Sequence, residues 1–130
     1  MTVNVFAQKD VKLKINHNLG TSAFAFNTEA QNDLGHQFKL TRLEYYISGI
    51  SITHDGGMET KVSDTYILAK ANQTNSVLLG NLDVTNIESI NFYIGVDAGV
   101  NNGDPTAWQA SHALSPKSPS MHWGWAAGYR

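Results

Sequence analysis

The longest patterned stretch of the chain reads Gln37-Phe38-Lys39-Leu40-Thr41-Arg42-Leu43-Glu44-Tyr45-Tyr46-Ile47-Ser48-Gly49-Ile50-Ser51-Ile52-Thr53. Apolar side chains alternate cleanly at Leu43, Tyr45 and Ile47, and the alternation slips across Ser48 and Gly49. A period of two is typical of a half-buried strand, and a slip at a glycine is typical of a β-bulge. The stretch therefore predicts one long, bent β-strand.

Shorter stretches on both sides repeat this pattern. Residues 11–17 alternate with His17 on the apolar side, residues 61–68 return after the turn residues 54–57, and residues 87–96 alternate with Ile90, Phe92 and Ile94 inward. Gly, Asn and Asp turns separate these strands, and only a helical turn at 108–113 is indicated besides. The chain is therefore predicted to be all-β, an antiparallel β-sandwich of the Ig-like or jelly-roll-like kind.

Length and composition indicate one folded domain. The chain has 130 residues, of which 42% are hydrophobic and 15% charged, so a single core can form without disulfides. The net charge of −2 with scattered Lys and Arg argues against nucleic acid as a partner, and the absence of cysteine excludes thiolate metal sites. No window of about 18 apolar residues predicts a membrane span.

The first eight residues allow two interpretations. They are mostly apolar and end in Ala7-Gln8 before charged residues, which is typical of the tail of a secretory signal peptide. They are equally compatible with a first edge strand. Residues 9–130 are predicted to form the single β-sandwich domain, and the signal-peptide interpretation would place that domain outside the cytoplasm.

The region after residue 96 carries few patterns of regular structure. Oxygen-bearing side chains alternate between Asp97 and Asp104, but the bidentate glutamate that closes a calcium loop is missing, and ordinary Asx turns explain the same residues better. No Gly-x-Ser-x-Gly motif or pair of catalytic carboxylates is evident, so we expect a protein that is not an enzyme. His54, beside a turn aspartate, is expected at the surface.

The end of the chain, residues 120–130, is the segment richest in reactive side chains. Imidazole and thioether groups suit a soft or borderline ion such as copper, and an indole can shield the ion or be oxidised by it. The candidate metal ligands are His17, His122, Trp123 and Trp125, with Met121 and His112 as weaker candidates. The alternative is an aromatic plug in which the two indoles only close the sandwich.

Several sequence blocks together carry a family resemblance. They are Leu40-Thr41-Arg42-Leu43-Glu44-Tyr45-Tyr46-Ile47-Ser48-Gly49-Ile50, Tyr66-Ile67-Leu68, Gly95-Val96-Asp97, Leu114-Ser115-Pro116 and Met121-His122-Trp123-Gly124-Trp125-Ala126-Ala127-Gly128-Tyr129-Arg130. In their order and spacing, over residues 11–130, these blocks resemble the MbnP-like family of bacterial copper-binding proteins. The paired Leu-Glu-Tyr-Tyr-Ile-Ser and Trp-Gly-Trp blocks are specific in combination.

The resemblance implies a periplasmic or secreted β-sandwich that binds copper. It further implies a partner resembling a dihaem peroxidase, oxidation of Trp123 or Trp125 to kynurenine, and copper ligation by His17 and His122. Family members continue beyond the Gly-Tyr-Arg block with further strands, so we expect either that this chain is a fragment or that a second chain completes its sheet. The competing hypothesis is a structural or adhesive module, such as a secreted fibre subunit, that self-assembles through open sheet edges.

Overall fold

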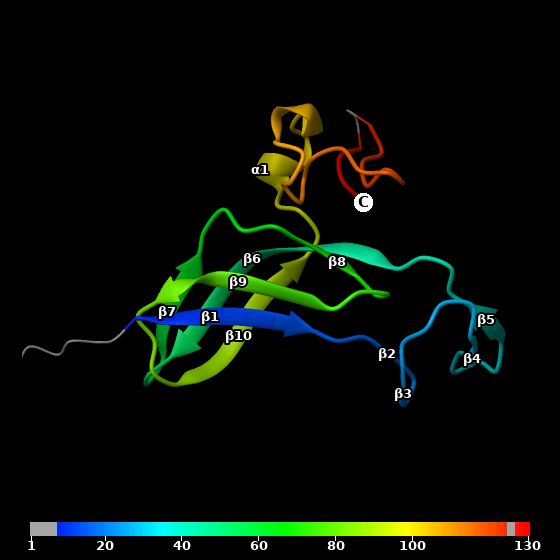
Figure 1. Cartoon of the computed structure of the whole chain (residues 1–130), viewed down its shortest axis with the longest axis horizontal. Coiled ribbons are helices and arrows are strands. Elements are labelled where there is room, and N and C mark those ends of the chain that lie inside the picture. The colour runs from blue at the N-terminus through cyan, green and yellow to red at the C-terminus, as the bar shows by residue number, and fades with distance from the viewer. Residues whose placement is uncertain (1–7, 125–126) are drawn as a thin grey trace, which may run out of the picture.

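The computed structural model describes residues 8–124 and 127–130 (Figure 1). Its strands are β1 (Lys9–Ile15), β2 (Asn18–Leu19), β3 (Ser22–Ala23), β4 (Glu29–Gln31), β5 (Gln37–Lys39), β6 (Glu44–His54), β7 (Met58–Val62), β8 (Ile67–Lys70), β9 (Asn75–Leu82) and β10 (Ile87–Ile94). Two helical turns follow, α1 (Ala98–Asn101) and η1 (Pro105–Ala107). No helix in the described ranges is long and apolar enough to cross a membrane. Residues 1–7 lie outside the described part, so the signal-peptide and edge-strand interpretations of this segment both stay predictions.

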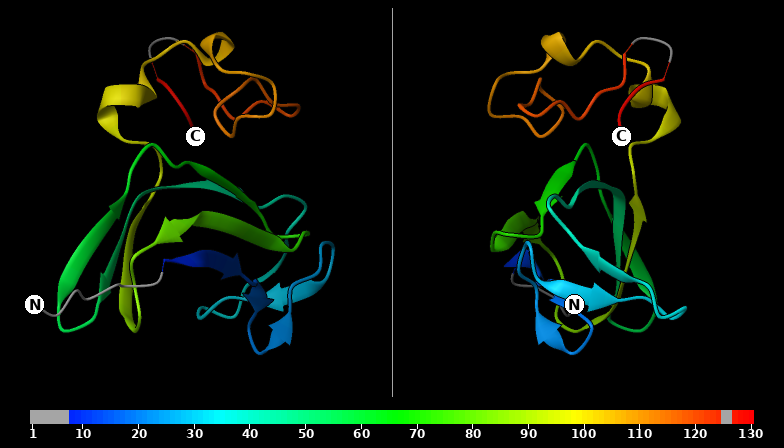
Figure 2. Two further views of the ribbon diagram at one scale, coloured as in Figure 1. Left: turned by 60° about the vertical axis from the view of Figure 1, so that its left-hand side comes forward. Right: turned by 90° about the vertical axis from the view of Figure 1, so that its right-hand side faces the viewer.

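Six of the strands form two packed antiparallel layers, while β2–β3 and β4–β5 are separate two-stranded hairpins (Figures 1 and 2). One layer is the order β10-β6-β7, with β8 also paired to β6, and the other is β1 paired with β9. Apolar side chains from both layers meet in the main core, which comprises Val11, Ile47, Ile50, Ile52, Val62, Ile67, Leu79 and Val84. The predicted all-β antiparallel sandwich is therefore confirmed.

The stretch 37–53 contains two strands, and the prediction of a single one was wrong. β5 pairs with β4 in a hairpin of its own, while β6 begins the four-stranded sheet. Between them the Leu40 carbonyl accepts the Asn27 N–H at 2.9 Å, which ties the connecting segment to the hairpin. The predicted bulge is confirmed, because the β10 register shifts between Asn91 and Tyr93 opposite Gly49, whose φ is +60°.

The bulge keeps β6 in register with the core on both sides of Gly49. Tyr45 and Ile47 face the core before the bulge, and Ile50 and Ile52 face it afterwards. Tyr46 points to the opposite face and is fully buried there. One strand thus contributes side chains to two separate clusters.

The cap, defined as residues 97–124 and 127–130, covers the Tyr46 side of β6 at one end of the sandwich (Figure 2). Its buried residues Leu114, Met121 and Tyr129 pack with Tyr46 as a second core. The helical turn expected at 108–113 lies earlier in the chain, at η1. The Asp104 carboxylate accepts the Thr106 N–H at 2.8 Å and Pro105 occupies the first turn, so the local capping residues start the helix there.

The apolar side of β10 is only partly buried, contrary to the expectation for its alternating residues. Ile90 is half-buried, but Phe92 is 44% exposed and Ile94 72% exposed. β10 pairs only with β6 among the described strands, so it forms an edge of the sheet and its other side has no pairing partner there. Periodicity specified a strand here, while its position in the sheet determined how much of it is buried.

Candidate metal site

The end of the chain folds back on itself around His122. His122 and Tyr129 form an isolated antiparallel bridge, and the Trp123 N–H donates to the Gly128 carbonyl at 2.8 Å. The Arg130 N–H donates to the Met121 carbonyl at 2.9 Å. These backbone bonds fix the His122 side chain beside the Tyr129 ring, at 4.9 Å between centroids in an edge-to-face arrangement.

One ring nitrogen of His122 has no partner. Nδ1 accepts the Gly124 N–H at 3.0 Å, whereas Nε2 is buried and makes no hydrogen bond within the described part of the protein. A buried polar atom without a partner costs about 1–3 kcal/mol, so such an atom is a candidate ligand position. Because Nδ1 accepts, the neutral ring carries its proton on Nε2. An ion could bind Nε2 of the neutral ring only if this proton moved to Nδ1, which would break the hydrogen bond from the Gly124 N–H.

A hollow of about 260 Å³ lies beside this imidazole. Met121, His122, Trp123 and Tyr129 contribute to its walls, as does the half-buried Lys117. The Lys117 ammonium donates to the His112 carbonyl at 2.7 Å, so a fixed positive charge borders the space. An ion in the hollow would need strong donors to offset this repulsion, and a monovalent ion would suffer less of it than a divalent one.

The Met121 side chain is buried by packing, and its sulfur already has a hydrogen-bond donor. Its side chain is 4% exposed, and its sulfur accepts from the Arg42 guanidinium at 3.1 Å. Arg42 is itself paired with Glu44 at 2.6 Å. The thioether therefore joins the cap to the start of β6, and copper ligation by Met121 would have to replace that contact.

Trp123, one of the two tryptophans predicted as site residues, lies at the surface of the cap. Trp123 is 64% exposed, and the Arg130 guanidinium carbon lies 3.9 Å from its ring centroid. This is a cation–π contact at the surface, outside the buried core that the plug hypothesis requires. Trp125, the other predicted site residue, lies outside the described residues.

His112 also lies in the cap, but its ring packs on Trp108, whereas the His122 ring packs on Tyr129. Its ring stacks on Trp108 at 4.1 Å between centroids and 11° between planes, and its Nδ1 accepts the Leu114 N–H at 3.1 Å. Its roles in stacking and turn formation explain its burial. Asp104 accepts the Thr106 N–H, as an Asx turn predicts, whereas the Asp97 carboxylate accepts the distant Tyr66 hydroxyl at 2.6 Å.

His17 lies at the end of β1, on the other side of β6 from His122. Its Nε2 is 2.6 Å from the Tyr45 hydroxyl, and its buried Nδ1 makes no hydrogen bond to the part of the chain that the structure describes. If Nε2 donates to Tyr45, the Nδ1 lone pair is free, which is the arrangement of a metal-binding histidine held by a second group. Tyr45 and Tyr46 are consecutive on a strand and point to opposite faces, so the structure separates His17 from His122.

The tyrosines next to these histidines were not predicted as site residues. Burial, with smaller effects from Tyr129 and Glu44, raises the pKa of Tyr46 to about 12, and its hydroxyl donates to the Ala113 carbonyl at 3.1 Å. Burial also raises the pKa of Tyr45 and of Tyr129. All three therefore stay protonated at neutral pH. Adjacent tyrosines on a strand were the available sequence signal, since such a pair must face both sides of the sheet.

His54 is buried, and the expectation of a surface residue was wrong. It is 3% exposed, with Nδ1 at 2.8 Å from Asp55 and Nε2 at 2.7 Å from the Thr60 hydroxyl. Asp55 also accepts the N–H groups of Thr85 and Asn86, and these bonds together with His54 lower its pKa to about 2. Both ring nitrogens are satisfied, so His54 is a structural histidine that ties the β6–β7 turn to residues 85–86.

The fold and site thus define an all-β protein whose cap presents a buried imidazole among aromatic side chains. The family model MbnP matches residues 8–130, and the chain belongs to the MbnP family. Membership makes it a copper-related extracytoplasmic protein. No curated protein and no solved structure matches it. Among the described residues, no group of three or more His, Asp or Glu side chains is close enough together to hold a metal ion.

Proposed function

We propose that the protein binds copper in the cap, with His122 as its principal ligand, and acts as a binding protein rather than an enzyme in the periplasm or outside the cell. The unpartnered, buried Nε2 of His122 beside the hollow carries this proposal, in a chain of the MbnP family. Imidazole is a suitable donor for either oxidation state of copper. The positive charge of Lys117 favours Cu(I) over Cu(II).

His17 enters the proposal as a second ligand whose role can be separated from that of His122. His17 contacts Tyr45 on one face of β6, whereas His122 contacts Tyr129, which packs on Tyr46 on the opposite face. One ion held by both would require the cap or the β1–β2 connection to move. If instead the described arrangement persists, loss of His17 leaves copper binding in the cap intact.

Oxidation of Trp123 or Trp125 to kynurenine is the further part of the proposal. A haem enzyme resembling a dihaem peroxidase would be the oxidant, and the exposed Trp123 ring lies where a protein partner can approach it. The balanced change is Trp + 2 H₂O₂ → kynurenine + formic acid + H₂O, in which the indole C2–C3 bond breaks and C2 leaves as formic acid. The product gains an aromatic amine and a ketone, which are additional donors for an ion.

Copper titration of metal-free protein tests the site. We expect Cu(I), measured by competition with a chromophoric chelator, to bind with a Kd below about 1 µM, and His122→Ala to weaken it by about a hundredfold or more. His36→Ala is the matched control, since His36 is exposed in the β4–β5 hairpin. Equal affinities for wild type and His122→Ala would refute the cap site, and a large loss in His17→Ala would show a shared ion.

Intact mass tests the oxidation separately. Protein isolated from its native host should be heavier than recombinant protein by about 4 Da, because kynurenine formation replaces one carbon by one oxygen. Trp123→Phe and Trp125→Phe variants, produced in the same host, should identify the modified residue by loss of the shift. An unmodified mass for the native protein would exclude this step while leaving copper binding to be judged by the titration.

A second candidate, assembly through an open sheet edge, is favoured by β10. Its free edge adjoins an apolar groove of about 320 Å³ lined by Leu13, Ile15, Ile47, Phe92 and Ile94. Exposed edge strands template pairing with another strand, and exposed apolar patches mark interaction sites. A strand from a second copy, with the same alternation as β10, would bury Phe92 and Ile94 on the core side.

Light scattering over a range of protein concentrations distinguishes this candidate from copper binding. Assembly through β10 should persist with a strong chelator and disappear in Ile94→Lys, because a charged edge residue blocks pairing. Leu34→Lys, which changes another exposed apolar residue on the β4–β5 hairpin, is the control. A monomer at all concentrations would rule out assembly by this edge.

A further inference from the structure

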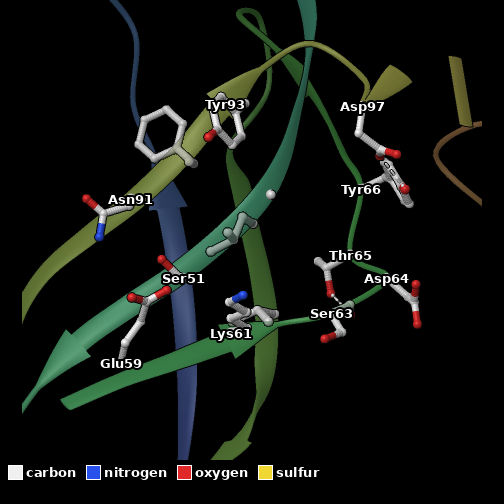
Figure 3. Close-up of a pocket in the computed structure, with 14 residues that line it drawn as sticks. Ser51, Glu59, Lys61, Ser63, Asp64, Thr65, Tyr66, Asn91, Tyr93 and Asp97 are labelled. Atoms are coloured by element: carbon white, nitrogen blue, oxygen red, sulfur yellow. Dashed lines mark hydrogen bonds between the residues drawn. The ribbon is translucent and has the colours of Figure 1, made fainter. Parts of the chain in front are cut away.

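A second surface, which shares no lining residue with the His122 hollow, has the features of a ligand site. It is a groove of about 730 Å³ on the outer face of the β10-β6-β7 sheet, opposite the main core (Figure 3). Ligand pockets in proteins commonly span about 300–1,000 Å³. Neither the copper proposal nor the edge assembly uses this face.

The groove follows from the side chains of the central strand. Gly49 and Ser51 provide its floor and carry almost no bulk. Lys61 on β7 and Asn91 on β10 are the register partners of Ser51, so longer side chains stand on both sides of the small one. Figure 3 shows Ser51, Lys61 and Asn91 projecting from three neighbouring strands around the hollow.

Tyr93 supplies an aromatic wall. It is 74% exposed, and its ring edge rests on Gly49 so closely that a Cβ added to Gly49 would lie 2.5 Å from the Tyr93 Cδ2. A glycine is therefore needed at this position for the ring to lie where it does. An aromatic face held in place over a sheet attracts the weakly positive C–H groups of a sugar ring, and Tyr loses little conformational entropy in doing so.

The polar groups of the groove are available to a ligand. Ser51, Glu59 and Lys61 make no side-chain hydrogen bond or ion pair among the described residues, and Asn91 makes one long bond of 3.5 Å to Thr53. The Ser51 hydroxyl and the Asn91 amide can donate and accept hydrogen bonds, the Lys61 ammonium donates, and the Glu59 carboxylate accepts. The lining holds the carboxylates Glu59, Asp64 and Asp97 against the single ammonium of Lys61, which disfavours phosphate and other anions.

We propose that this groove binds a neutral saccharide, which stacks on Tyr93 and receives hydrogen bonds from the Ser51, Asn91 and Lys61 side chains. No evenly spaced aromatic platform of the kind that binds carbohydrate is evident in the sequence, and Trp108 is partly buried against His112. A single tyrosine beside a polar, small-residue floor replaces such a platform. The side chains that hold the saccharide lie on β6, β7 and β10, and Asp97 is the cap residue that lines the groove. We therefore expect binding at this site not to require copper.

NMR titration of the metal-free protein with cellotriose, maltotriose and chitotriose tests the proposal. At least one should give saturable amide shifts at residues 49–51 and 91–93, with a Kd of about 1 mM or tighter. Tyr93→Ala should weaken it about tenfold and Tyr93→Trp should retain it, while Phe38→Ala on the β4–β5 hairpin should change nothing. Ser51→Val, which fills the floor with a residue suited to strands, should abolish binding.

The result that overturns the proposal is the absence of saturable shifts with all three oligosaccharides, or shifts that persist unchanged in Tyr93→Ala. Trilysine serves as a competing probe, because the carboxylates alone would attract a cationic peptide. Shifts with trilysine and none with the saccharides would also overturn it. Circular dichroism of each variant verifies that the fold is retained.

Discussion

Tyr45 and Tyr46 are neighbours in the chain, yet each leads to a different histidine. The Tyr45 hydroxyl contacts His17 at the end of β1, while the Tyr46 ring packs on Tyr129, which in turn packs on His122. Both histidines carry one buried nitrogen that has no hydrogen-bond partner within residues 8–124 and 127–130. The difference teaches that two matching imidazoles in a sequence need not share a site, because the pleat of a single strand separates them.

His54 provides the reference for that comparison. It is as buried as a core residue, but Asp55 and Thr60 satisfy both of its nitrogens. Burial alone therefore does not distinguish a ligand from a structural histidine. A nitrogen without a partner among the described residues is available to a ligand, which is why His17 and His122 are proposed as ligands and His54 is not.

The largest expected effect comes from removing either tyrosine ring. Tyr46 is fully buried between the sheet and the cap, so Tyr46→Ala should cost about 3–5 kcal/mol of unfolding free energy and abolish copper binding at His122. Tyr45 is only partly buried, so Tyr45→Ala should cost about 2 kcal/mol and leave the His122 site intact. Urea denaturation with copper titration measures both. Equal loss of copper in the two variants would contradict the separation of the faces.

Acid stability should depend on Asp55, the carboxylate that contacts His54, and should not involve His17 or His122. The pKa of Asp55 is about 2 in the fold and 3.8 ordinarily, so the native state favours the carboxylate. Its contribution is complete above pH 3.8 and is lost as the pH falls from there towards 2. Asp55→Asn should lower stability at neutral pH and flatten this acid dependence, with copper affinity unchanged. An acid unfolding curve that matches wild type would show that Asp55 does not stabilise the turn.

The hydroxyls of the two tyrosines should have smaller effects. Tyr46→Phe leaves the Ala113 carbonyl without its donor, and Tyr45→Phe leaves the His17 Nε2 without its partner, each at a cost of about 1 kcal/mol. In a double-mutant cycle, His17→Ala should remove most of the Tyr45→Phe effect and none of the Tyr46→Phe effect. Thermal unfolding of the six proteins gives both couplings. A coupling between His17 and Tyr46 would argue against the two-sided arrangement.

The smallest expected effect is at the surface of the cap. Arg130→Ala removes the guanidinium from the Trp123 ring, which should cost no more than about 1 kcal/mol and shift the indole fluorescence. Arg130→Lys should retain part of the contact, and copper affinity should be unchanged in both. A loss of copper comparable to His122→Ala would show that Arg130 holds the site together.

Local pattern accounts for much of the fold. The alternation in residues 11–17 and 87–96 predicted β1 and β10, and the slip at Gly49 predicted the bulge, since side-chain period and glycine conformation are properties of the local backbone. The break between β5 and β6 was missed because residues 40–43 keep an apolar, β-compatible composition while the chain changes sheets. The candidate site was predicted by residue type alone, and its assembly stays a prediction.

By itself the sequence determined the all-β class, the family, and the presence of imidazole, thioether and indole groups near the end of the chain. Only the tertiary structure decided which groups meet: it placed His17 and His122 on opposite faces, paired the Met121 sulfur with Arg42, buried His54, and left Phe92 and Ile94 at an open edge. The physical reason is that strand periodicity is written in neighbouring residues, whereas burial and contact depend on which distant strand lies alongside.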